Sequence, residues 1–136
     1  MRASRGDARA AVSETGAVLQ LARDLLKRAD PSTAGLWPRA AALLTRQALE
    51  ESVDAYWRAR QLPLDSLSTQ AQLVCLRMMT MTADKTLAAR LHEAWGALSR
   101  ACHHHPYELA PTAAELAAWI AVVEEFDREM ESGQKA

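Results

Sequence analysis

Glycine, proline and cysteine are scarce in this chain of 136 residues, which has 5 Gly, 5 Pro and 2 Cys. Aromatic residues make up only 5% of the chain, and β-branched residues are few. This composition argues against a collagen-like repeat, which needs regular glycine, and against a β-sandwich or barrel, which needs β-branched strands and many turns. Cys75 and Cys102 are too few for a disulfide framework, and no CxxC pair suggests structural zinc.

Long apolar runs and a strong charge of one sign are also missing. The longest apolar run, Leu116–Val123, is far shorter than a membrane span, and residues 1–10 lack the apolar segment of a signal peptide. The formal net charge is −1, so no overall basic field favours nucleic acid. We therefore expect a cytoplasmic protein without a membrane segment, a metal or a cofactor.

Helix-forming residues dominate what is present, namely Ala, Leu, Arg and Glu, and 49% of the chain is hydrophobic. Apolar residues three and four positions apart predict five helices. These helices cover about 7–29, 38–60, 69–79, 83 to the histidines at 103–105, and 112 to about 130. Short loops between them make sequential helices antiparallel. The predicted fold is an all-α, single-domain antiparallel bundle over 8–131, with flexible termini at 1–7 and 132–136.

Local signals mark several helix ends. Pro31 and Pro106 stop the first and fourth helices, and Pro38 suits the first turn of the second. Thr112 and Glu115 form a capping box at the start of the fifth helix. The second helix is apolar around much of its circumference, so we expect it to be central.

The third predicted helix is the least regular. Its expected inward face consists of Ala71, Val74, Cys75, Met78 and Met79. The four tryptophans, Trp37, Trp57, Trp95 and Trp119, fit core packing better than base stacking, because three of them fall on apolar stripes.

Several kinds of catalytic site are absent from the sequence. It has no Glu-x-x-His pair for a carboxylate-bridged metal site, no glycine-rich phosphate loop and no nucleophile elbow.

The unusual segment is RACHHHPY at 100–107, where three consecutive histidines stand at the end of a helix. Adjacent helical side chains point about 100° apart, so the three imidazoles do not converge on one metal ion. A structural interpretation is that they complement the helix dipole and bond to the last carbonyls.

A second interpretation is chemical. Arg100 and His104 share a helix face, whereas His105 lies where Pro106 forces the backbone out of the helix, so its side chain can turn toward Arg100. A guanidinium binds phosphate oxygens, and an imidazole moves a proton near neutral pH. Such a pair suits cleavage of a phosphodiester next to a 2′-hydroxyl.

The segment from Arg100 to His105, in a small helical chain, resembles the Arg-x4–6-His signature of the HEPN family. The flanking segments LHEAWGALSR (91–100) and HPYELAPTAAEL (105–116) and the stretch Ala41–Trp57 are similar to that family too. The resemblance covers residues 8 to 130 and implies a HEPN-like, metal-independent endoribonuclease acting on RNA as a homodimer. It assigns catalysis to Arg100 and His105, with His104 as a substitute. It also implies a toxin–antitoxin or phage-defence role, with an antitoxin or nucleotidyltransferase as partner.

Ala101 departs from the family pattern, because active relatives usually carry a polar residue at that position. This departure favours an alternative, a catalytically inactive HEPN-like module that binds nucleic acid or protein. A third hypothesis is a purely structural dimer.

Three acidic residues of the second predicted helix, Glu50, Glu51 and Asp54, also have two interpretations. They order the active-site arginine across the bundle, or they form a solvated helix face.

Overall fold

The structure is a computed structural model that describes residues 5–27, 36–79, 85–103 and 109–135, with side chains for 14–27, 36–79, 86–103 and 109–131. Its elements are α1 (Arg5–Lys27), α2 (Trp37–Ala59), the 3-10 turn η2 (Pro63–Ser66), α3 (Thr69–Met79), α4 (Lys85–Cys102) and α5 (Ala113–Lys135). The described residues contain no strand. The predicted all-α bundle is confirmed.

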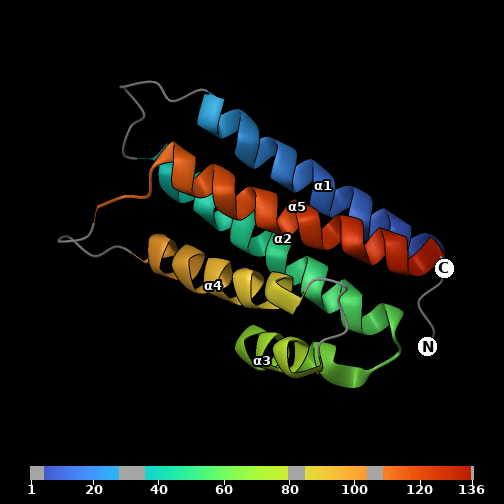
Figure 1. Ribbon diagram of the computed structural model, residues 1–136. Coiled ribbons are helices and arrows are strands. Elements are labelled where there is room, and N and C mark those ends of the chain that lie inside the picture. Colours follow the sequence, from blue (N-terminus) through green and yellow to red (C-terminus); the bar gives the residue numbers. More distant parts are fainter. Residues whose placement is uncertain (1–4, 28–35, 80–84, 104–108, 136) are drawn as a thin grey trace.

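Helix α2 is the centre of the bundle, as its wide apolar surface predicts. It packs against α1, α3, α4, α5 and η2. The longer helices α1, α2, α4 and α5 lie roughly along one direction, and the short α3 lies below α4 at the edge (Figure 1). Helices α2 and α5 both begin near the end of the bundle where α4 finishes, so α4 runs antiparallel to both of them (Figure 1).

The predicted helix ends that fall on described residues agree closely with the observed ones, whereas Pro31 and Pro106 lie outside the described residues. Helix α3 has the predicted bounds, and Pro38 lies in the first turn of α2. The capping box before α5 is confirmed: the Glu115 N–H donates to Thr112 Oγ1 at 3.1 Å, and the Thr112 N–H donates to Glu115 Oε1 at 3.1 Å. Helices α1 and α5 reach into segments 1–7 and 132–136, because α1 begins at Arg5 and α5 ends at Lys135.

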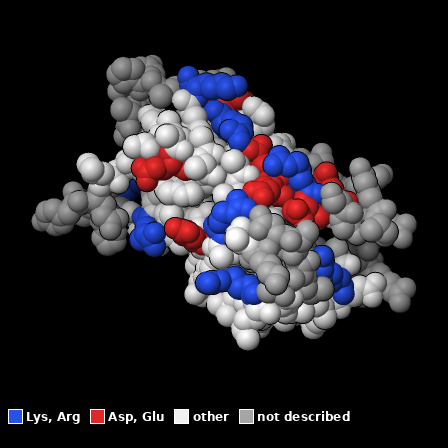
Figure 2. Space-filling model, in the orientation of Figure 1, with Lys and Arg blue, Asp and Glu red and all other residues white. Residues whose placement is uncertain are grey.

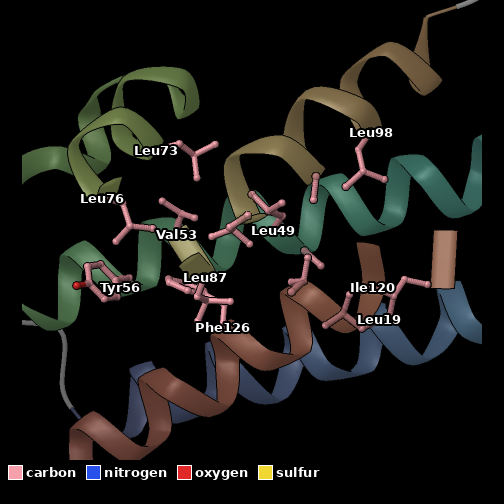
Figure 3. Close-up of a cluster of buried hydrophobic side chains, with 14 of the residues drawn as sticks. Leu19, Leu49, Val53, Tyr56, Leu73, Leu76, Leu87, Leu98, Ile120 and Phe126 are labelled. Atoms are coloured by element: carbon pink, nitrogen blue, oxygen red, sulfur yellow. The ribbon is translucent and has the colours of Figure 1, made fainter. Parts of the chain in front are cut away.

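One continuous apolar core joins the helices (Figure 3). Its largest fully buried side chains include Trp57, Tyr56, Phe126, Leu49, Leu98 and Ile120. The Tyr56 ring meets the Trp57 ring edge-on at 4.9 Å between centroids and the Phe126 ring at 5.5 Å. The described buried residues of α1, α2, α4 and α5 recur three and four positions apart, the spacing from which the sequence predicts these helices.

The predicted inward face of α3 is wrong. The structure buries Gln72, Leu73 and Leu76, whereas Met78 is 79% exposed and Val74 39% exposed. The observed buried face thus lies on a different side of the helix from the predicted one. In the observed orientation of α3, Leu73 and Leu76 both face α2 and α4 (Figure 3). The Gln72 amide nitrogen donates to the Leu67 carbonyl at 2.8 Å, which anchors the start of α3.

Polar contacts join α5 to its neighbours. Arg90 of α4 binds the Glu125 carboxylate through two nitrogens, at 2.8 and 3.0 Å, and Arg23 of α1 forms an ion pair with Glu124. These side chains are about one-third exposed, so each pair contributes modestly to stability and mainly favours one register. Helix α5 is therefore held on two sides by charge as well as by its apolar face.

A buried carboxyl group connects α5 to α2. Asp127 is 8% exposed and accepts a hydrogen bond from the Ser52 hydroxyl. Burial raises the pKa of Asp127 to about 6, the Ser52 hydrogen bond opposes this shift, and the nearby Glu131 and Glu124 carboxylates add to it. The folded protein thus favours the protonated form of this side chain at mildly acidic pH.

We predict that Leu98→Ala lowers the free energy of unfolding by about 2–5 kcal/mol, because the fully buried side chain leaves a cavity. Leu43, which is 57% exposed on α2, provides a matched control. Leu43→Ala should change stability by about 0.5 kcal/mol or less. Chemical denaturation followed by circular dichroism measures both. Equal effects of the two substitutions would contradict the observed burial.

We predict that Asp127→Asn stabilises the protein at pH 8 and not at pH 4. The folded-state pKa of Asp127, about 6, is above the ordinary value of an aspartate, about 3.8. The stability that the protonated side chain contributes is therefore complete below pH 3.8 and is lost as pH rises through about 6. A difference of about two pKa units corresponds to about 2–3 kcal/mol. Asn keeps an acceptor for Ser52 without the buried charge. Denaturation at several pH values measures the gain.

The exposed Asp65, for which Asp65→Asn is the matched control, should show no such pH-dependent gain. An Asp127→Asn variant that is equally destabilised at both pH values would mean that the carboxylate itself stabilises the fold.

Candidate functional site

Arg100 lies in the last turn of α4, and its side chain is exposed. The His103 N–H donates to the Arg100 carbonyl at 3.2 Å, and α4 ends at Cys102, so the helix finishes at the histidine run as predicted. Within the described ranges, Arg100 forms no ion pair with a carboxylate. His103 is exposed, while His104 and His105 lie outside the described residues.

The guanidinium of Arg100 is on the side of α4 that faces away from the core. Leu91 and Leu98 are fully buried, whereas Glu93 and Arg100, seven residues apart, are exposed. A Cβ added at Gly96, one turn earlier, would lie 3.6 Å from Arg100 Nη1. The Arg100 side chain therefore extends back along the helix surface over a small residue.

The side of α4 that faces α2 is held by the Glu50 carboxylate, which binds both Trp95 and Arg46. Glu50 Oε1 accepts a hydrogen bond from Trp95 Nε1 of α4 at 3.1 Å and from Arg46 Nε of its own helix at 3.0 Å. Glu50 thus does reach across the bundle, but it contacts Trp95 and not Arg100. Glu51 accepts from Gln47 one turn earlier on α2, at 3.5 Å. The interpretation that these acids order Arg100 directly is not what the structure shows.

Arg46 is the basic residue of this network. Its pKa is raised, chiefly by the hydrogen bond to Glu50; burial opposes the shift, and the Cys102 thiol adds to it. Arg46 therefore lies beside the last turn of α4, on the flank that faces α2. Cys102 has a free, half-buried thiol beside the Arg46 guanidinium. A zinc site would need further His or Cys side chains beside this thiol, so the position does not suit a zinc ligand.

Other candidate groups have structural roles. Among the described residues, no group of three or more His, Cys, Asp or Glu side chains could hold a metal ion. Trp57 is fully buried, and the other three tryptophans pack against the core, so all four contribute to packing. Arg60 lies over the Tyr56 ring, 3.6 Å from its centroid, and donates to the Tyr56 carbonyl at 3.4 Å. Arg60 thus has a structural role at the end of α2.

Comparison of the chain with models of protein families, with characterised proteins and with solved structures finds no match. Over the described part of the chain, no helix is long and apolar enough to cross a bilayer. The functional argument therefore depends on the residues at the end of α4 and on their surroundings.

We predict a coupling energy of about 1 kcal/mol or more between Glu50 and Trp95, since a hydrogen bond to a charged acceptor is worth more than a neutral one. The double-mutant cycle uses Glu50→Ala, Trp95→Phe and the double variant, with unfolding free energies from denaturation. A second cycle with Glu51→Ala is the control and should give coupling near zero, because Glu51 bonds within its own helix. Equal coupling in both cycles would mean that Glu50 does not hold α4.

Proposed function

We propose that this chain is a HEPN-like, metal-independent endoribonuclease that acts in the cytoplasm. The observation that carries the proposal is the placement of Arg100: its guanidinium is exposed in the last turn of α4, three residues before the first of three consecutive histidines, and no described carboxylate neutralises it. Other arginines of the bundle, such as Arg23 and Arg90, form salt bridges with glutamates. The positive charge of Arg100 is not used in this way and suits the binding of an anionic substrate.

The proposed reaction needs only a guanidinium and an imidazole. Arg100 binds the non-bridging oxygens of the scissile phosphate, and His105 moves protons, with His104 as the substitute. The 2′-oxygen loses its proton and attacks phosphorus, and the bond to the 5′-oxygen breaks as that oxygen is protonated. The products are a 2′,3′-cyclic phosphate and a free 5′-hydroxyl, so no metal or external reductant takes part.

The proposed enzyme is a homodimer, because one Arg/His pair lacks a second proton-transfer group. The outward side of α4 suits such packing: Gly96 and Ala97 are small, and small residues let two helices approach closely. Two copies joined there bring two Arg100 side chains to one cleft, where a bound polyanion offsets their repulsion. An antitoxin or a nucleotidyltransferase is the proposed regulatory partner.

Ala101 favours the second candidate, an inactive module that binds nucleic acid or protein. Its side chain is half-buried and packs against the core, so it supplies no polar group to the site. RNA binding without cleavage is the expected behaviour of such a module.

We predict that Arg100→Ala and His105→Ala each abolish RNA cleavage in excess chelator and leave stability nearly unchanged, since Arg100 is exposed. The double variant should be no worse than either single one, as expected for residues that act together. The assay follows labelled RNA and tests for 2′,3′-cyclic ends. Arg58→Ala, at the exposed end of α2, is the matched control and should keep full activity.

Three results distinguish the candidates. Binding of RNA by the wild-type chain without cleavage would establish the inactive module, and absence of both would exclude an RNA function. Sedimentation that shows only monomer at micromolar concentration would contradict the composite site.

A further inference from the structure

Among the described residues, an arginine and a histidine from two different helices contact each other. Arg77, in the last turn of α3, has its Nη1 atom 3.4 Å from Nδ1 of His92, on α4. The other ring nitrogen, Nε2, lies 3.1 Å from Oε1 of Gln70, in the first turn of α3. No sequence spacing indicates this cluster, because 15 residues separate Arg77 from His92.

The hydrogen bonds define the state of the imidazole. A guanidinium has donors only, so Nδ1 of His92 must accept from Arg77, and the proton of the neutral ring is on Nε2, where it donates to Gln70. Partial burial lowers the pKa of His92, and the positive charge of Arg77 lowers it further. Of the charged groups that the structure describes on α2, α3 and α4, Arg77 alone contributes to this shift.

The surroundings of the cluster combine exposed charge with exposed apolar surface. Arg77 is exposed, and no described carboxylate forms an ion pair with it. Val74 and Met78, on the same helix, are 39% and 79% exposed and line an open hollow together with Arg77. Figure 2 shows basic surface in the region where α3 lies against α4.

We infer that this hollow on α3, whose Arg77 contacts His92 of α4, binds a small phosphate monoester with a planar or apolar body, of the nucleoside monophosphate class. Arg77 presents two nitrogens to the phosphate, as guanidinium groups do with planar or tetrahedral anions. His92 turns from an acceptor into a second donor when it takes up a proton. Val74 and Met78 cover the organic body, and a methionine side chain adapts to a flat ring.

Proton uptake gives this site a signature that a simple basic patch lacks. A bound dianion neutralises the charge of Arg77 and favours the imidazolium of His92, so binding takes up a proton. The affinity for the phosphate monoester should therefore fall as pH rises from 6 to 8. The site is independent of Arg100, so the inference does not depend on the proposed ribonuclease activity.

The test is calorimetric titration of the full chain with adenosine 5′-monophosphate, inorganic phosphate and adenosine. We expect the monophosphate to bind more tightly than either fragment, and about tenfold more weakly at pH 8 than at pH 6. Arg77→Gln should weaken binding at least tenfold. Arg58→Gln removes the same charge from the exposed end of α2 and should bind like the wild type.

His92→Gln tests the proton uptake, because its amide can still donate a hydrogen bond but does not titrate. In this variant the affinity should no longer fall as pH rises from 6 to 8, and circular dichroism should confirm that each variant is folded. Absence of binding by the wild type, or binding equally retained in Arg77→Gln, would overturn the inference. Binding that is lost in Arg100→Ala and kept in Arg77→Gln would overturn it as well and would place the ligand at the end of α4.

Discussion

The rest of this bundle depends on the burial of α2. A helix that contacts every other element must be apolar around most of its circumference, and α2 meets this demand with small and large side chains together. Its buried alanines, Ala41, Ala42, Ala48 and Ala55, let neighbouring helices approach closely, while Tyr56 and Trp57 fill the wider space near its C-terminal end. Other helices then need only one apolar stripe each, since they meet α2 on one side.

The position of α4 follows from this arrangement. On one side the helix buries Leu87, Leu91 and Leu98 in the core. A hydrogen bond between Glu50 and Trp95 joins it to α2, and the ion pair between Arg90 and Glu125 joins it to α5. Contacts on these three sides leave little freedom for rotation about the helix axis. The remaining side carries Glu93 and Arg100 into solvent, so the exposure of Arg100 results from the packing of residues on the other faces.

Helix α3 shows the opposite case, a helix at the edge of the bundle. It packs against α4 and only lightly against α2, so it buries few side chains and leaves Val74 and Met78 in solvent. Its apolar residues surround the helix almost evenly, and such a pattern does not define one inward face. In this peripheral position Arg77 contacts His92, and exposed charge lies beside the exposed apolar side chains of Val74 and Met78.

Much of the fold could be predicted from residue order alone. Apolar spacing, Pro38 and the Thr112–Glu115 capping box act over three or four residues, so they determine where α2, α3 and α5 begin and which faces of α1, α2, α4 and α5 are buried. The position of Arg100 at the end of α4 could be predicted for the same reason. The rotation of α3, the Glu50 bond to Trp95 and the meeting of Arg77 with His92 could not. All three depend on contacts between residues that are distant in sequence. Which side chains meet is decided only when α2, α3 and α4 pack together around one core.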